Sequence, residues 1–392
     1  MENVEFCIIV VGYNRPDAMS RLLNSLRDAD YSGDNVDLLV SIDRGDRQQE
    51  IIKIAEAYEW RFGKKRIRAF DKRQGLKEHI LKCGDETDNY ETVIVLEDDI
   101  SVSKAFYIYA KQCIKKYKND DRIAGISLYK HHINVGVNNF FEPEFNGYDC
   151  FFMQFAQSWG ECWTAKMWKG FRKWYEVNKD VCFSKNNKDF LKKIPNNIIG
   201  WGEKSWMKYY MAYIVAKDLY FVYPYISLST NHSEAGQHRE TTCSDYQVAL
   251  NNALMDFDLP EFENAVKYDV FFERIDFIVP GFEITDVTMD LYGNKKFDNQ
   301  TRFLISTAKK NYRIVESFKL KYRPQELNCV YRELGNDIFI YDTTEIKDNS
   351  FKQKNYLRDR YDVRSIGWRA LLGLGICEVL DAICQKFGRM VR

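Results

Sequence analysis

Three carboxylates stand side by side at the end of an apolar run. Residues 93–96 are Val, Ile, Val and Leu, and Glu97, Asp98 and Asp99 follow them directly. A short β-branched run without polar alternation indicates a buried strand, and open α/β sheets bind their ligands at the carboxyl ends of such strands. Adjacent carboxylates repel one another unless something neutralises them. This acidic triplet is therefore either a solvated turn or a site for a divalent cation that also binds phosphate oxygens.

A second acid occupies a comparable place earlier in the chain. Asp43 follows the apolar residues 36–42, and a carboxylate there could accept hydrogen bonds from a base or a ribose hydroxyl. The same residue could equally cap a turn or a helix. The chain has no GxGxxG after its first apolar run and no GxxxxGK[ST], which are the usual phosphate-binding loops. A nucleotide bound without such a loop would need a metal on its diphosphate, and the acidic triplet could hold one.

The elements around these acids alternate between strand and helix patterns. Strands are expected at 6–12, 36–42, 66–70 and 93–96, and helices at 17–27, 51–62 and 75–83. In the first of these helices the apolar residues fall on one face. Such alternation is typical of βαβ units. We therefore expect an α/β fold with a mainly parallel sheet flanked by helices.

The pattern changes near residue 269. Short strands are expected at 274–279, 287–291, 302–306, 313–320, 329–333 and 337–341, and the last thirty residues form an apolar helical stripe. We expect an α/β domain over 1–265, a smaller β-rich accessory module over 266–350 and a C-terminal helical segment with an amphipathic helix over 351–392. The terminal helix could pack on the α/β domain, pair with a second copy or lie on a membrane surface.

Composition restricts the function classes. Fifty-seven basic residues balance 57 acidic ones, which argues against a broad nucleic-acid footprint. The ten cysteines include no CxxC, so we expect reduced thiols. The N-terminus lacks a signal-peptide pattern, and no run reaches the roughly 18–20 apolar residues of a membrane span. We expect a cytoplasmic protein, with a peripheral position at the inner face of the membrane as an alternative.

The order of these motifs resembles a known enzyme class. An apolar strand leads into Tyr13-Asn14-Arg15-Pro16, a second strand ends at Asp43, the segment 73–79 reads Arg-Gln-Gly-Leu-Lys-Glu-His, and a strand ends in the acidic triplet. Over residues 5–240 this order resembles GT-A glycosyltransferases of the family 2 kind. The GluAspAsp form of the triplet is also similar to that of N-acetylglucosaminyltransferase I.

The resemblance implies a role for each of these residues. Asp99 would be a ligand of Mn²⁺ or Mg²⁺, Asp98 would contact the ribose or the donor sugar, and Glu97 would lie near the nucleoside. Asp43 would meet the uracil or the ribose. The remaining residues expected to line the nucleotide pocket are Val11, Tyr13, Arg15, Arg73, Gly75 and His79.

Three further segments are candidates for the sugar and acceptor side. Residues 200–206 resemble the loop that carries the catalytic acid in that class, so Glu203 would be the base and Trp201 would face the acceptor sugar, although here only one acid stands between the tryptophans. Residues 157–161, with Trp159 and Glu161, could form a sugar wall or core. Residues 231–238 contain His232 and His238, and His232 could reach the metal or belong to a solvated loop.

The leading hypothesis is a metal-dependent, inverting glycosyltransferase. A nucleotide sugar, most simply a UDP-sugar, would be the donor, and a glycan or lipid-linked glycan would be the acceptor. An inverting transfer needs a carboxylate to take the proton of the acceptor hydroxyl while a metal neutralises the leaving diphosphate. The alternatives are a sugar-nucleotide pyrophosphorylase, whose glycine-rich loop is missing here, and a non-catalytic protein that binds glycans or nucleotide sugars on a transferase scaffold.

Overall fold

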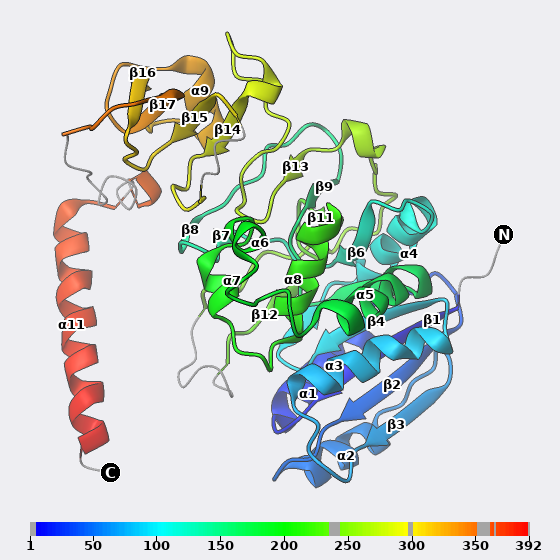
Figure 1. Cartoon of the computed structure of the whole chain (residues 1–392). Helices are drawn as coiled ribbons and strands as arrows, with labels where there is room; N and C mark the ends of the chain where they lie inside the picture. Colours follow the sequence, from blue (N-terminus) through cyan, green and yellow to red (C-terminus); the bar gives the residue numbers. More distant parts are fainter. Residues whose placement is uncertain (1–4, 235–243, 297–300, 351–360, 364–365, 391–392) are drawn as a thin grey trace.

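A nine-stranded sheet forms the centre of the protein (Figure 1). The computed structural model describes residues 5–234, 244–296, 301–350, 361–363 and 366–390. The sheet has the strand order β13-β9-β11-β6-β10-β4-β1-β2-β3. Its strands are β1 (Phe6–Gly12), β2 (Val36–Ile42), β3 (Lys65–Ala69), β4 (Thr92–Glu97), β6 (Ile123–Ser127), β9 (Cys150–Met153), β10 (Glu161–Thr164), β11 (Tyr220–Pro224) and β13 (Lys267–Tyr268).

Most strands of this sheet run parallel. The pairs β1–β2, β1–β4 and β2–β3 are parallel, as are β6–β11 and β9–β13. β10 enters antiparallel between β4 and β6, and β9 pairs antiparallel with β11. Every residue of β1 is buried, which requires cover on both faces of the sheet. The predicted mainly parallel α/β fold is confirmed.

Helices supply that cover on both sides of the sheet (Figure 1). Helices α3, α5 and α8 contact one another, and α1 contacts α2. The side chain of Thr164 caps α5 by accepting a hydrogen bond from the Met167 amide at 3.2 Å. Their bounds are α1 (Pro16–Arg27), α2 (Gln48–Ala57), α3 (Leu76–Gly84), α4 (Phe106–Tyr117), α5 (Ala165–Asn178), α6 (Lys188–Lys192), α7 (Asn196–Gly200) and α8 (Trp206–Lys217).

A second, four-stranded sheet follows in the chain. It has the order β14-β15-β17-β16, with β14 (Val287–Asp290), β15 (Phe303–Ser306), β16 (Tyr312–Phe318) and β17 (Ile338–Ile346). It has a hydrophobic core of its own that includes Met289, Ile305 and Ile340. The core of the large sheet continues past residue 265 to Phe272 and also includes Tyr292, and the exact boundaries between the three parts stay a prediction.

Two of the expected short strands are not strands. Residues 329–333 were expected to be extended, but α9 (Asn328–Tyr331) is a helical turn. The side chain of Asn328 accepts hydrogen bonds from the amides of Lys321 and Tyr322, at 2.7 and 2.8 Å, and this bonding favours a turn over an extended chain. Residues 274–279 form no strand, because beyond the single bridge from Arg274 to Tyr268 they have no ladder partner among the described residues.

The C-terminal helix α11 (Trp368–Met390) confirms the expected helical segment. Its apolar stripe is exposed at Leu372, Ile376, Leu380 and Ile383. The expectation that this stripe packs on the α/β domain is therefore wrong. Pairing with a second copy and contact with a membrane surface stay predictions. Among the described residues, none of the helices combines the length and the apolar character needed to cross a bilayer.

Small sheets and short helices complete the architecture. β5 (Ile100–Val102) pairs with β12 (Ser229–Asn231), and β7 (Ile133–Asn134) pairs with β8 (Asn139–Phe140). The short 3₁₀ turns are Asp85–Asp88, Phe262–Asn264, Ile284–Asp286 and Gln325–Leu327. The eight cysteines whose side chains are described are unpaired, as expected for reduced thiols.

Packing between β6 and β11 leaves no room for a side chain at Gly125. A Cβ there would lie 2.4 Å from the ring of Phe221, which is fully buried. We predict that Gly125→Ala lowers the free energy of unfolding by about 1–3 kcal/mol, the usual cost of overpacking a core, as measured by urea denaturation. Gly200→Ala, where a Cβ would have no neighbour within 4 Å, is the control. Equal stability of the two variants would contradict this packing.

Candidate functional site

Strand register brings the sequence motifs to one edge of the sheet. On β1, Val11 lies opposite Glu97 of β4 and Ser41 of β2. Because the three strands are parallel, the residues that follow them, Tyr13, Asp43 and Asp98, leave the same carboxyl edge. The structure thus gathers segments far apart in the chain around the acidic triplet. Val11 itself is buried, so its contribution to the site is packing beneath the edge.

A guanidinium group lies on the acidic triplet. Arg15, just before α1, contacts Asp98 and donates from Nη1 to Asp99 Oδ2 at 3.1 Å. Asp98 is buried, at 2% exposure. Burial raises the pKa of Asp98 to about 6, although Arg15 acts in the opposite direction. Burial also raises the pKa of Glu97, and the charge of Asp99 adds to this shift. One cation therefore neutralises the triplet only in part.

Two oxygens of the triplet are left without partners. Oδ2 of Asp98 and Oδ1 of Asp99 are buried and make no hydrogen bond to a described group. Buried carboxylate oxygens without donors are costly, and a hard cation would satisfy them. The described residues contain no group of three or more His, Cys, Asp or Glu side chains that could hold a metal. The donor set fits Mg²⁺ or Mn²⁺ bound through one or two carboxylates together with phosphates, the usual arrangement for Mg²⁺.

Asp43 fixes a neighbouring loop. Its Oδ1 accepts from the amides of Arg44 and Gln74, both at 2.8 Å, and its Oδ2 accepts from the amide of Gly75 at 2.9 Å. Gly75 has φ +76°, a conformation that favours glycine, and it precedes α3. The turn-capping alternative for Asp43 is therefore realised, and contact of its remaining lone pairs with a base or ribose stays a prediction.

A side chain of the Arg73–Gly75 loop contacts one of the loop after β1. The guanidinium carbon of Arg73 lies 5.1 Å from the centre of the Tyr13 ring, within the range of a cation–π contact. Tyr13 is partly exposed and Arg73 is exposed. A planar base could stack in such surroundings.

His79 lies below this surface. It is 2% exposed, and its Nε2 is 2.8 Å from Ser41 Oγ. Burial lowers the pKa of His79 to about 4, so the ring is neutral at physiological pH. This burial excludes a direct ligand contact in the described conformation, and His79 supports β2 from α3.

The β5–β12 pair carries His232 next to Asp99. The amide of His232 donates to the Asp99 carbonyl at 2.9 Å, and His232 Nε2 is 2.8 Å from Ser101 Oγ. Beside it, Arg21 of α1 forms a two-bonded ion pair with Glu234, at 2.7 and 2.9 Å. Sequence reasoning missed this pair, because residues 213 positions apart give no local signal. His238 lies outside the described residues.

Glu203 is exposed in the turn before α8. Ser205 caps this helix by accepting from the Lys208 amide at 3.3 Å, and Lys208 Nζ donates to the Trp201 carbonyl at 2.7 Å. Trp201 is partly exposed. Trp206 is buried against Trp163 and Tyr210, so it has no face available to a sugar.

Trp159 belongs to an aromatic cluster with Tyr129 and Tyr246. Its ring centre is 4.6 Å from that of Tyr246 and 4.8 Å from that of Tyr129. The amides of Ser158 and Trp159 donate to Gln157 Oε1, at 2.7 and 3.1 Å. Tyr246 was not anticipated from the sequence. Trp159 is partly exposed, so both the wall and the core interpretations stay open.

A fully buried acid lies beside the triplet. Glu161 opens β10 opposite Val95 of β4 and is 0% exposed. Neither of its carboxyl oxygens has a hydrogen-bond partner among the described groups. Burial raises the pKa of Glu161 well above its usual range, and the charge of Glu97 raises it further. Both effects favour the neutral, protonated form of Glu161.

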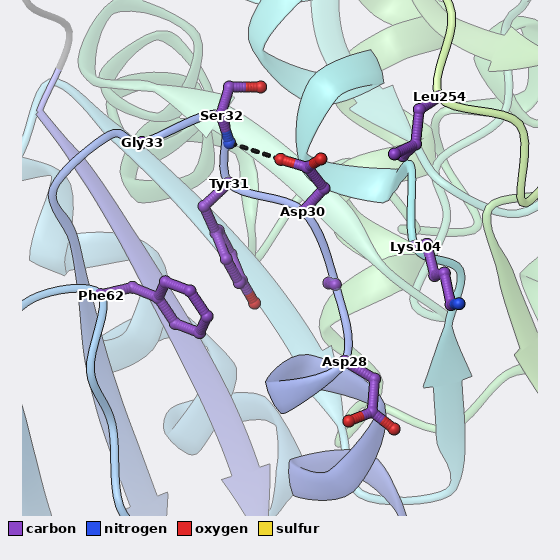
Figure 2. A pocket seen from close by; sticks show the side chains of 9 residues that line it. Asp28, Asp30, Tyr31, Ser32, Gly33, Phe62, Lys104 and Leu254 are labelled. Carbon is purple, nitrogen blue, oxygen red and sulfur yellow. Dashed lines mark hydrogen bonds between the residues drawn. The ribbon is translucent and has the colours of Figure 1, made fainter.

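A hollow of about 360 Å³ lies away from these residues. Figure 2 shows its lining, in which Tyr31 and Phe62 stand beside Asp28 and Asp30. These residues follow α1 or precede β2 and β3, which places them at the amino edge of the sheet. None of the residues predicted for the nucleotide site lines this hollow. Its volume therefore does not identify it as that site.

The raised pKa of Glu161 has a measurable consequence. The folded protein keeps a proton that the unfolded chain releases above about pH 4.3, so this residue makes the free energy of unfolding fall as the pH rises. We predict that Glu161→Gln becomes more stable relative to the parent chain between about pH 5 and pH 8, as measured by urea denaturation. Glu56→Gln, on an exposed position of α2, is the control. A stability difference independent of pH would contradict a neutral Glu161.

The sequence matches no protein-family model and no curated protein. Among solved structures, TarS 1-349 from S. aureus is 15% identical over 59% of this chain and 61% of that chain, with a TM-score of 0.37, and its complex with UDP-GlcNAc is 13% identical over 60% of each chain, at 0.37. The mannosyltransferase PcManGT from Pyrobaculum calidifontis, in complex with GDP-Man and Mn²⁺, is 12% identical over 42% of this chain and 45% of that chain, at 0.30. The chain thus aligns with less than two thirds of each, and TM-scores this low support no inference about ligand or reaction.

Proposed function

We propose that the chain is a metal-dependent, inverting glycosyltransferase. It moves a sugar from a nucleotide sugar, most simply a UDP-sugar, to a hydroxyl group of a glycan or lipid-linked glycan, as in surface polysaccharide synthesis. The observation that carries this proposal is the pair of unpartnered oxygens on Asp98 and Asp99, at the sheet edge where Asp43 holds the Arg73–Gly75 loop. Carboxylates buried close together are neutralised better by a divalent cation, which also binds a diphosphate, than by water.

The proposed nucleoside pocket lies between the two loops at this edge. Tyr13 and Arg73 contact each other, so a base would stack on the outer face of one of them. Asp43 keeps the loop of Arg73 in place through two backbone hydrogen bonds, from the amides of Gln74 and Gly75. Asp98 would accept from a ribose or sugar hydroxyl. Arg15, already on the triplet, is placed to donate to the diphosphate as the charges rearrange.

Asp99 would hold the Mn²⁺ or Mg²⁺ ion, with His232 beside it. The metal would neutralise the leaving diphosphate when bound. Two contacts hold Asp99 in position. Arg15 donates to one carboxylate oxygen of Asp99, and the His232 amide donates to its backbone carbonyl.

Glu203 would take the proton of the acceptor hydroxyl, which attacks the anomeric carbon from the face opposite the diphosphate. Its exposure leaves it free to reach an acceptor. Lys77 near the start of α3 lies 5.2 Å from the ring of Tyr209 on α8, which links the nucleotide loop to the helix that begins beside Glu203.

The alternatives differ in what they bind. A non-catalytic scaffold would bind a glycan or nucleotide sugar without turnover, and a pyrophosphorylase would form nucleotide sugars from a nucleoside triphosphate. Calorimetric titration with UDP, with and without Mn²⁺, and a screen of nucleotide sugars for metal-dependent hydrolysis test the proposal. Metal-dependent UDP binding with hydrolysis supports the transferase, whereas absence of both would overturn it.

Asp99→Asn tests the metal role while it preserves shape. The amide oxygen can still accept from Arg15, but the charge that attracts the cation is lost. We predict at least a tenfold weaker Mn²⁺-dependent UDP affinity in calorimetry, consistent with the loss of a charged ligand. Asp180→Asn, on an exposed position, should bind as the parent chain does. Unchanged metal dependence in the Asp99 variant would exclude Asp99 as a ligand.

Glu203→Gln tests the proposed base. Loss of general-base catalysis typically costs about 10²–10⁴-fold in rate, so we predict a fall of that size in kcat for nucleotide-sugar hydrolysis. The UDP affinity should stay the same, because Glu203 is not placed at the nucleotide. A full rate in this variant would assign the base to another residue.

A further inference from the structure

Another hollow of the described structure lies outside the proposed transfer site. It has a volume of about 160 Å³, several times the roughly 10–15 Å³ that one water needs and below the roughly 300–1,000 Å³ of an ordinary small-molecule pocket. None of the residues proposed for the donor, the metal or the acceptor base lines it. Its lining comes from the β7–β8 pair and from the short segment before α11: Ile133, Asn138, Asn139, Phe140, Asp362 and Val363.

Asp362 is the charged residue of this lining, and its side chain lacks a donor. It is nine-tenths buried, at 9% exposure. Its Oδ2 accepts hydrogen bonds from Asn139 Nδ2 at 2.6 Å and from the Phe140 amide at 3.3 Å. Its Oδ1 is buried and has no hydrogen-bond partner among the described groups. Because a buried carboxylate oxygen without a donor is costly, a ligand that donates to Oδ1 would be favoured here.

Both walls of the hollow are held by side chains from the second module. Arg323 donates from Nη2 to the carbonyls of Tyr361 and Asp362, at 2.7 and 2.8 Å. On the opposite wall, Tyr292, which follows β14, donates its hydroxyl to the Phe140 carbonyl at 3.0 Å. The hollow is therefore formed without a ligand, which lowers the ordering cost of binding one.

The rest of the lining is largely apolar. Ile133 and Val363 are partly exposed, and the side chain of Phe140 is half exposed. The guanidinium carbon of Arg323 lies 5.8 Å from the centre of the Phe140 ring, so the exposed part of the ring is what a ligand would meet. An aromatic ring beside hydrogen-bonding groups suits a ligand with one apolar face and one polar edge.

Three classes of ligand have a group that satisfies a carboxylate oxygen: hydroxyl compounds, ammonium ions and metal ions. The amides of Asn138 and Asn139 both donate and accept hydrogen bonds, which matches hydroxyl groups, whereas an ammonium ion only donates. Ca²⁺ takes about six to eight oxygen ligands, and the described residues contain no group of three or more His, Cys, Asp or Glu side chains that could hold a metal. The lining therefore favours a hydroxyl-rich ligand.

We propose that this hollow binds one pyranose unit of a glycan, with a hydroxyl group donating to Asp362 Oδ1 and a face of the sugar ring against Phe140. A pyranose ring combines the two surfaces that the lining requires, because its C–H groups form an apolar face and its hydroxyl groups form a polar edge. The inference goes beyond the proposed function. It assigns a non-catalytic glycan-binding site that does not depend on sugar transfer by the same chain.

The test measures sugar binding to the full chain without nucleotide or metal. The methyl glycosides of glucose, galactose, mannose and N-acetylglucosamine are titrated in EDTA and followed by saturation-transfer NMR. We expect at least one of them to bind, and we expect sorbitol, which has the hydroxyl groups without the ring, not to bind. Phe140→Ala removes the apolar wall, and Asp362→Asn removes the charge while it keeps the shape. Each should weaken binding of that glycoside at least about tenfold.

Two matched variants outside the lining are the controls. Phe145→Ala and Asp286→Asn, both on exposed positions, should bind the glycoside within about twofold of the parent chain. Absence of binding by all four glycosides would overturn the proposal, as would equal loss of binding in the target and control variants.

Competition separates the sugar from the other ligand classes. Displacement of the glycoside by methylammonium, or by Ca²⁺ in a sample without EDTA, would assign the hollow to a cation and overturn the proposal. Displacement by UDP with Mn²⁺ would place the sugar at the donor site and would also overturn it. Nucleotide-sugar hydrolysis is measured separately, so its absence would overturn the transferase and leave this glycan site standing.

Discussion

The mutual repulsion of carboxylates at one strand end constrains the whole site. Glu97, Asp98 and Asp99 are adjacent, and Glu161 joins them from β10. If all four were ionised where they lie, the cost of desolvation would exceed what Arg15 can offset. Three effects lower this cost: burial raises the pKa of Glu161, burial raises the pKa of Glu97 and of Asp98, and Arg15 contacts both aspartates. The two oxygens still without partners are what an added cation would relieve.

The rest of the fold keeps those acids together. Parallel pairing of β2, β1 and β4 fixes which residues leave the sheet side by side, and burial of β1 along its whole length makes a slip in register costly. The carboxylate of Asp43 accepts hydrogen bonds from three backbone amides. These bonds stabilise its charge and hold the neighbouring loop at the edge of the sheet. The β5–β12 pair then closes the side next to Asp99.

The alternation of apolar runs and helical patterns was enough to predict the sheet, because strands buried on both faces have a strong local signature. The place of Asp43 and of the triplet followed from the same reasoning, since a parallel strand ends at a known edge. The sequence could not show that Asp43 would bind backbone amides, that His79 would be buried, or that Trp206 would lie in the core. Each depends on contacts between segments distant in the chain. The helical turn at Asn328 was missed because side-chain bonding to two amides outweighed its strand-like residues.

The net charge of zero does not show where the charged side chains of this protein lie. Equal numbers of acids and bases give a neutral chain, yet Glu97, Asp98, Asp99 and Glu161 lie together at the ends of the paired strands β4 and β10. A donor diphosphate brings negative charge toward the acids and becomes favourable only with a cation between them. In the proposed transfer the cation would therefore have to be present for the diphosphate to bind, and the paired strands of the sheet would hold the acids where the two meet.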